Sequence, residues 1–244
     1  MTQSIQTRKL GKSVYLFSLA ALGLGLIAAC CYQLYSEGIG YQWLLLTALA
    51  GISANASLKI PGVNSKISVA DTFVLTSMIF FGPAAGCITA AAEGLCGSLR
   101  SKTKSKRLQF TLFNMGSLAI CAYLAAHLFF LVSGTGPFCQ SPGSFPPNLF
   151  LAVVILALGY YLLNSGSVAL MVALDSGGNA YRIWKENFVW QVMNYFACAF
   201  AAILISLNSS LFSPSVLISL GLVVMIIDMA YRNLLRRLAT NPQA

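Results

Sequence analysis

The sequence predicts an all-α, polytopic transmembrane helix bundle, and three observations lead to that fold class. Apolar residues make up 57% of the 244-residue chain and charged residues only 9%, whereas about a quarter of the residues are charged in ordinary soluble domains. The apolar residues gather in long uninterrupted stretches. All 15 Lys and Arg residues fall between or beside these stretches. A chain of this composition has too little polar surface to cover a water-facing exterior.

Five stretches are long enough to cross a bilayer, since a spanning helix needs about 20 apolar residues. They are Ser13–Tyr35, Gln109–Ser133, Leu149–Ala173, Val189–Leu207 and Ser215–Tyr231. We therefore assign residues 13–231 to a single transmembrane domain. An N-terminal tail of residues 1–12 precedes it, and a C-terminal tail of residues 232–244 follows it.

The apolar pieces between the first two of these spans are shorter. They are Tyr41–Asn55, Ile67–Phe81 and Pro83–Ser98, each of about 15 residues and so below the usual span. The last two meet at Gly82-Pro83, a turn signal with almost no loop. Two arrangements fit: eight spans, or six spans with residues 67–98 forming a re-entrant hairpin. Both give the same orientation, because a two-segment hairpin enters and leaves on one face.

The basic residues occur only in alternate gaps between the apolar stretches. These gaps carry Arg8, Lys9 and Lys12; Lys59 and Lys66; Arg100, Lys102, Lys104, Lys106 and Arg107; Arg182 and Lys185; and Arg232, Arg236 and Arg237. Cytoplasmic loops of membrane proteins are enriched in Lys and Arg, so the pattern predicts that every basic loop and both termini are cytoplasmic. Charges at the ends of apolar segments fit anionic lipid. We therefore expect the lipid bilayer, and no nucleic acid, as a partner.

Cysteine, histidine and short motifs give no sign of metal or enzyme chemistry. Of the seven Cys residues, only Cys139 falls in a predicted outside loop, so no disulfide framework is indicated. The single histidine, His127, excludes a multi-histidine metal site. The chain also lacks a Walker loop, a Gly-x-Ser-x-Gly elbow and a His-Glu-x-x-His helix. We expect no metal, no cofactor and no catalytic residue.

Small residues recur every four positions after the Gly-Pro turn. The members of this stripe are Gly82, Gly86, Ala90 and Gly94. Such a stripe lies on one helix face and lets helix backbones approach closely in lipid. Tight helix packing is the first interpretation, and a cavity lined by backbone is the alternative.

Asp71 and Glu93 are the acidic residues of the short apolar hairpin. Asp71 lies eleven residues before Gly82 and Glu93 ten residues after the following proline. At about 1.5 Å per residue both lie roughly 15–16 Å from the turn, level with each other across the hairpin. An intramembrane carboxylate costs about 2.5–3.5 kcal/mol at a helix centre, so a ligand-binding or proton-linked role is one interpretation. In the other, both residues cap helices or pair with Lys66 or Arg100 near the cytoplasmic face.

Three asparagines lie inside three different apolar segments, with tyrosines nearby. The asparagines are Asn114, Asn164 and Asn194, and Tyr161 is the tyrosine we group with them. Hydrogen bonds between helices are the ordinary role of such residues. If the side chains converge instead, they form an apolar cavity with a few oriented polar groups, as small-ligand sites do.

Several short segments resemble the MASE-type integral-membrane sensor regions of bacteria. The first is the run Lys59–Phe73 (KIPGVNSKISVADTF), followed by Phe80–Pro83 (FFGP). The second is Trp184–Trp190 (WKENFVW), which leads to Asn194–Phe196 (NYF), and the chain then reaches Ala230–Arg232 (AYR). The resemblance covers most of the chain in order. It implies a multi-pass protein of the bacterial cytoplasmic (inner) membrane.

In that family a cytoplasmic output module usually follows the membrane region, and this chain ends at Ala244 without one. The resemblance therefore implies either a detached sensing module or a standalone relative of these regions. As a sensing module it would bind a small ligand and signal to a cytoplasmic or membrane protein partner. The region Ser68–Gly97 is also similar to substrate-binding subunits of vitamin-uptake transporters, which implies a transport subunit as the alternative. A structural or assembly protein without a ligand is the third possibility.

Overall fold

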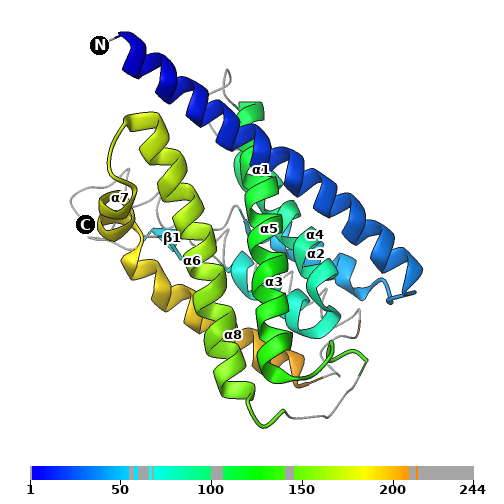
Figure 1. Ribbon diagram of the computed structural model, residues 1–244. Helices are drawn as coiled ribbons and strands as arrows, with labels where there is room; N and C mark the ends of the chain where they lie inside the picture. The colour runs from blue at the N-terminus through cyan, green and yellow to red at the C-terminus, as the bar shows by residue number, and fades with distance from the viewer. Residues whose placement is uncertain are drawn as a thin grey trace, which may run out of the picture.

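The computed structural model confirms a bundle of α-helices (Figure 1). The structure describes residues 2–54, 58–59, 66–67, 69–99, 107–140, 146–208 and 213. Within these residues the helices are α1 (Thr2–Ser36), α2 (Gln42–Ser53), α3 (Ala70–Phe81), α4 (Pro83–Leu99), α5 (Arg107–Ser133), α6 (Leu149–Ser176), α7 (Ala180–Asn187) and α8 (Val192–Ser206). A 3₁₀ turn, η2 (Val189–Gln191), precedes α8. Two short strands, β1 (Leu58–Lys59) and β2 (Lys66–Ile67), pair antiparallel between α2 and α3.

Four segments of the described chain are helical, long and apolar enough to cross a membrane. They are Leu10–Ser36, Leu108–Ser133, Leu149–Ser176 and Val189–Ser206. These segments match four of the five predicted spans. The fifth, Ser215–Tyr231, lies outside the described residues, as do the C-terminal tail and most of the basic gap that begins at Arg100. The first helix begins at Thr2 rather than at Ser13, so the predicted N-terminal tail continues the first span as helix.

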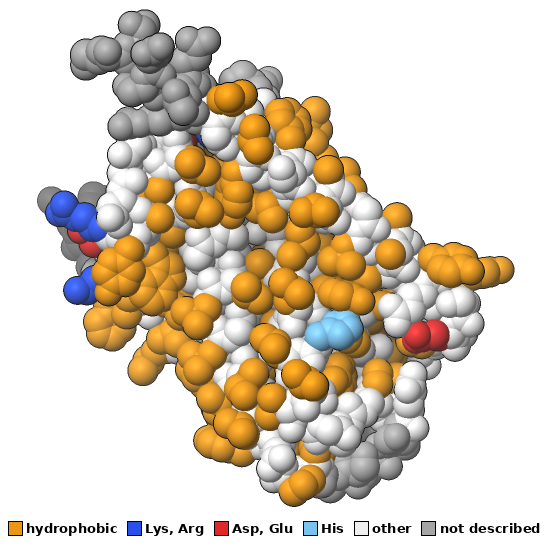
Figure 2. Space-filling model, in the orientation of Figure 1, with side chains coloured by type: hydrophobic (Ala, Val, Ile, Leu, Met, Phe, Trp, Pro, Cys, Tyr) orange, Lys and Arg blue, Asp and Glu red, His pale blue; other side chains and the backbone are white. Residues whose placement is uncertain are grey.

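The face of the bundle drawn in Figure 2 is largely apolar. Figure 2 shows hydrophobic side chains over most of one face, whereas the Lys, Arg, Asp and Glu side chains drawn there lie near its margins. Leu131, Phe150 and Leu204 are each about 70–80% exposed. Extended apolar surface of this kind marks contact with a membrane or a partner, which fits the predicted class.

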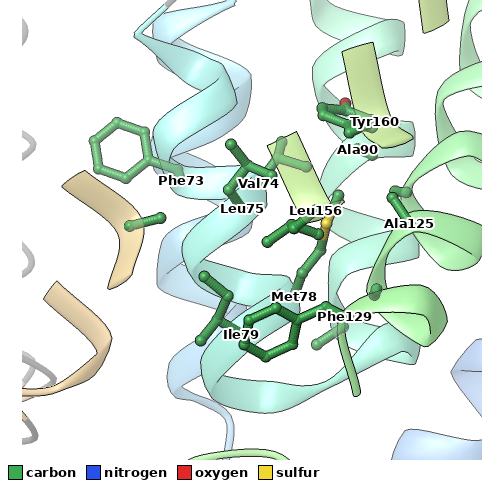
Figure 3. Packing of buried hydrophobic residues seen from close by; sticks show 14 of the residues in the cluster. Phe73, Val74, Leu75, Met78, Ile79, Ala90, Ala125, Phe129, Leu156 and Tyr160 are labelled. Carbon is green, nitrogen blue, oxygen red and sulfur yellow. The ribbon is translucent and has the colours of Figure 1, made fainter. Parts of the chain in front are cut away.

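Helix α3 lies inside the bundle and is buried on all sides. Every one of its residues except Thr72 is buried, and α2, α4, α5 and α8 pack around it. Figure 3 shows its side chains in one core cluster with Phe129 of α5 and Leu156 of α6. A helix that is apolar all round belongs inside a protein. Protein contacts therefore accommodate a segment that is too short to span a bilayer by itself.

Three hydroxyl side chains connect α2, α3 and α4 inside this apolar core. The Thr89 hydroxyl lies 2.9 Å from that of Thr47 and 3.0 Å from that of Ser77. It also donates to the carbonyl of Ala85 in its own helix. Hydrogen bonds between apolar helices of this kind hold neighbouring helices in register.

The turn between α3 and α4 is completed by the loop that follows α5. Gly82 has a φ of 96°, which residues with side chains rarely adopt. Pro83 has no N–H to donate to the carbonyl of Ile79, four residues before it. The Phe138 N–H donates to that carbonyl instead, at 3.3 Å, and the Cys139 N–H donates to the next carbonyl at 2.9 Å. The loop thereby satisfies carbonyl groups that the helix end leaves open.

The small residues of α4 lie at its closest contacts with neighbouring helices. A Cβ atom on Gly86 would overlap the side chain of Met78 in α3. One on Gly94 would lie 2.9 Å from the carbonyl oxygen of Asn114 in α5. Ala90, between the two glycines, is fully buried. The placement of the stripe corresponds to the packing interpretation of the sequence pattern.

A second close contact, between α1 and α5, involves glycines outside that stripe. A Cβ atom on Gly23 would overlap the backbone of Gly116, and one on Gly116 would lie 2.5 Å from the carbonyl oxygen of Leu19. Because backbone atoms cannot rotate away as a side chain can, only glycine permits this crossing. Gly25, two residues along α1, has no heavy atom within 4 Å of an added Cβ.

We predict opposite effects for the same substitution at these two positions of α1. Gly23→Ala forces α1 away from α5 and should lower the free energy of unfolding by about 1–3 kcal/mol, the usual range for overpacking. Gly25→Ala should leave stability unchanged or raise it by up to about 1 kcal/mol, since alanine favours helix. Thermal unfolding of the purified protein in detergent measures both. Equal effects of the two substitutions would contradict the proposed backbone contact.

Candidate functional site

Polar side chains from several helices converge on one cavity of about 230 Å³. Its walls come from α3, α4, α5, α6, η2 and the start of α8. The lining residues are Asp71, Glu93, Phe113, Asn114, Ser117, Leu118, Asn164, Val168, Gln191, Asn194 and Tyr195. Its volume lies just below the range of about 300–1,000 Å³ that is common for small-molecule pockets. The cavity can therefore admit a small polar molecule.

The two carboxylates of the α3–α4 hairpin both line this cavity. Asp71 lies in the first turn of α3 and is only 5% exposed. Its Oδ2 accepts a hydrogen bond of 3.1 Å from Nδ2 of Asn194 in α8. Glu93 lines the cavity from α4, as expected if the two residues are level across the hairpin. Of the alternative partners, Arg100 and the side chain of Lys66 lie outside the described part of the structure.

All three predicted asparagines reach the cavity, and each donates one amide hydrogen bond. Asn114 Nδ2 donates to Oγ of Ser98 at 2.8 Å, and Asn164 Nδ2 donates to the hydroxyl of Tyr195 at 2.7 Å. Asn194 makes the bond to Asp71 described above. The two interpretations of these residues therefore coincide: the side chains bond between helices and also line a common cavity.

Tyr161 is the one predicted site residue that the structure places elsewhere. Its hydroxyl donates to the carbonyl of Phe188 at 3.1 Å, and it does not line the cavity. Tyr195 takes that place, and its buried ring makes an edge contact with the ring of Tyr160, with centroids 5.4 Å apart. Tyr161 thus connects α6 to the segment before α8 through a hydrogen bond.

Sequence reasoning also missed Ser117 and Gln191, although a signal for both was present. Ser117 lies three residues after Asn114, and Gln191 lies three residues before Asn194. Residues three apart share a helix face, so each should have been grouped with its asparagine. The apolar part of the lining carries no comparable signal, because valine, leucine and phenylalanine occur throughout the chain.

The short helix α7 lies on the surface beside this region, and none of its residues is buried. Asn179 caps it by accepting a hydrogen bond from the N–H of Arg182. The Nε of Arg182 donates to Glu186 at 2.8 Å, which raises the pKa of the guanidinium above its ordinary value. Trp184 Nε1 donates to Oγ of Ser165 in α6 at 2.8 Å. The helix is therefore a polar surface element attached to the bundle through its tryptophan.

The cavity is acidic and rich in hydrogen-bond acceptors. The described residues of its lining include two carboxylates and four amide side chains, and no Lys, Arg or His is among them. Among the described residues, no group of three or more His, Cys, Asp or Glu side chains could hold a metal ion. The arrangement suits binding of a polar molecule.

No protein-family model, curated protein or solved structure matches this chain. The similarity to bacterial sensor regions and to vitamin-uptake subunits therefore remains a prediction from the sequence.

Two tyrosines beside the cavity give a matched prediction about its polar groups. The Tyr160 hydroxyl is buried and has no hydrogen-bond partner among the described residues, whereas that of Tyr195 accepts from Asn164. Tyr160→Phe should therefore leave the free energy of unfolding unchanged or increase it. Tyr195→Phe should lower it by about 0.5–1.5 kcal/mol, the net value of a typical hydrogen bond.

Thermal unfolding of both variants in the same detergent checks this prediction. The two substitutions remove the same atom from neighbouring rings, so the loss of ring packing is matched. A larger loss of stability in Tyr160→Phe than in Tyr195→Phe would contradict the hydrogen-bond assignment.

Proposed function

We propose that this protein is a membrane-embedded receptor that binds a small polar ligand in the cavity and signals to a cytoplasmic partner by a helix rearrangement. The observation that carries the proposal is the convergence of five predicted polar residues on one cavity. Polar residues inside apolar segments are expensive and usually mark a site or a pathway. A ligand shifts a protein between states only when its affinity for them differs. A ligand in the cavity would contact residues of five helices, so its affinity would change when these helices move relative to one another.

The proposed orientation places the cavity towards the cytoplasmic side. Asp71 lies in the first turn of α3 and Asn194 in the first turn of α8, and both helices follow basic gaps of the sequence. Under the positive-inside rule these ends face the cytoplasm, with both termini on the same side. The resemblance to bacterial sensor regions supports the cytoplasmic membrane of a bacterium as the location.

A transport subunit that works with a separate energising protein is the second candidate. One observation supports this second candidate. The enclosed α3–α4 hairpin brings one carboxylate from each of its two helices to the cavity. In that case the same cavity would open alternately to the two sides of the membrane. The two candidates share the binding step and differ in whether the ligand crosses.

Filling the cavity tests the shared binding step. We predict that at least one member of a library of small polar metabolites raises the melting temperature of the wild-type protein in nanodiscs. Val168→Phe, which places a ring against the cavity lining, should abolish that shift. Val172 lies one turn further along α6 at an exposed position, so Val172→Phe should preserve the shift in melting temperature. Absence of any shift in the wild type would favour a structural or assembly protein.

Partner capture and flux separate the two binding candidates. Crosslinking in native membranes followed by pull-down should recover a signalling enzyme if the protein is a receptor, and an ATPase-linked protein if it is a transport subunit. Uptake of the active compound into proteoliposomes that contain the protein and its captured partner would overturn the receptor in favour of the transport subunit.

A further inference from the structure

The charge of the cavity lining is one-sided. The described part of the lining contains two carboxylates, those of Asp71 and Glu93, and no Lys, Arg or His. Among the described residues, the only hydrogen bond to the buried carboxylate of Asp71 comes from the neutral amide of Asn194. A carboxylate taken out of water needs a compensating charge or several donors. The described surroundings of Asp71 provide one donor and no positive charge.

The orientation of two amide side chains shows which acceptors the lining presents. Ser98 donates its hydroxyl proton to the carbonyl of Gly94 at 2.6 Å, so its oxygen accepts from Asn114 and the Asn114 amide must present its NH₂ group there. A carboxylate likewise only accepts, which fixes the NH₂ group of Asn194 on Asp71. In the described structure, Oδ1 of Asn114 then has no hydrogen-bond partner. Oδ1 of Asn114 and the carboxylate oxygens are acceptors, so a ligand that binds to them must carry hydrogen-bond donors.

The size and the apolar wall of the cavity indicate an organic molecule. A volume of about 230 Å³ equals the liquid volume of about eight waters, whereas a bare cation binds its oxygen ligands at about 2.0–2.6 Å and needs a much smaller space. Phe113, Leu118 and Val168 form the apolar part of the lining. Alkyl groups pack against such side chains, and an aromatic face also attracts cations.

We infer that the cavity binds a small organic cation of the alkylammonium or alkylguanidinium class. Its charged head binds Asp71, with Glu93 and the side-chain oxygen Oδ1 of Asn114 as further acceptors. Its alkyl part packs against the apolar wall. This inference rests on the proposed receptor function and names the class of its ligand.

The test compares probes of the same length but different charge on the full-length protein in nanodiscs. The cationic probes are n-butylammonium and n-butylguanidinium; 1-butanol is the neutral control and butyrate the anionic one. Isothermal titration calorimetry should give dissociation constants for the cations that are about tenfold or more lower than for 1-butanol, as expected for a charge interaction at a buried site. Sodium and potassium chloride serve as controls for inorganic cations.

Variants locate the binding. Asp71→Asn keeps the shape of the side chain and removes its charge, and it should weaken n-butylammonium binding about tenfold or more. Glu37→Gln removes the charge of an exposed residue in the turn that follows α1 and should leave binding unchanged. If Asp71→Asn does not fold, Asn114→Leu, which removes an acceptor and keeps the volume similar, takes its place. Wild-type affinity in the folded variant would overturn the inference.

The outcomes distinguish this inference from the proposed function. Binding of 1-butanol or butyrate as tight as that of the cations overturns the ligand class and leaves a small-ligand receptor intact. A response to sodium or potassium that equals the response to n-butylammonium also overturns the organic-cation inference. If neither these probes nor any member of the metabolite library binds, the inference and the proposed function both fail.

Discussion

The enclosure of α3 by protein is the constraint on which the rest of the bundle depends. Its 12 residues extend about 18 Å at 1.5 Å per residue, whereas the hydrocarbon core of a bilayer is about 30 Å thick. In a bilayer, at least one end of such a helix lies in the hydrocarbon region, where no water can form hydrogen bonds to its free backbone N–H or C=O groups. The amides of Phe138 and Cys139 supply hydrogen bonds at its C-terminal end, and α2, α4, α5 and α8 cover its sides. Its N-terminal end is where the polar cavity forms.

The position of Asp71 at that N-terminal end reduces the cost of its burial. An intramembrane carboxylate costs about 2.5–3.5 kcal/mol at a helix centre. A hydrogen bond to a charged group, such as the one from Asn194, contributes about 1.5–3 kcal/mol. The partial positive charge at a helix N-terminus contributes about 0.3–1 kcal/mol more. These contributions offset part of the cost. Among the described residues no basic side chain supplies the rest, which is the contribution that a cationic ligand would make.

The sequence could reveal the polar residues of the cavity but not the rotation of the helices that carry them. Asp71 and Glu93 could be placed level because helical rise is fixed per residue, whatever surrounds the hairpin. The choice between Tyr161 and Tyr195 depended on which way α6 and α8 face, and successive residues on a helix differ by about 100° in direction. The contact at Gly23 was equally hidden, since one glycine on each of two helices makes no periodic pattern. The point at which two helices cross depends on how their surfaces pack, and the sequence of one helix does not show which helix is its partner.

The connection between the cavity and α7 gives the proposed receptor a physical route for its signal. Gln191 lines the cavity from η2, the turn that directly follows α7. On the other side of this turn, the carbonyl of Phe188 accepts from Tyr161 and Trp184 donates to Ser165, so two hydrogen bonds attach the segment to α6. A ligand that draws Gln191 towards Asp71 would shift η2 against these two bonds. Trp184 packs on the core and against the ring of Tyr161, so a shift of η2 would be passed to α7, whose other residues lie at the surface where a partner could detect the change.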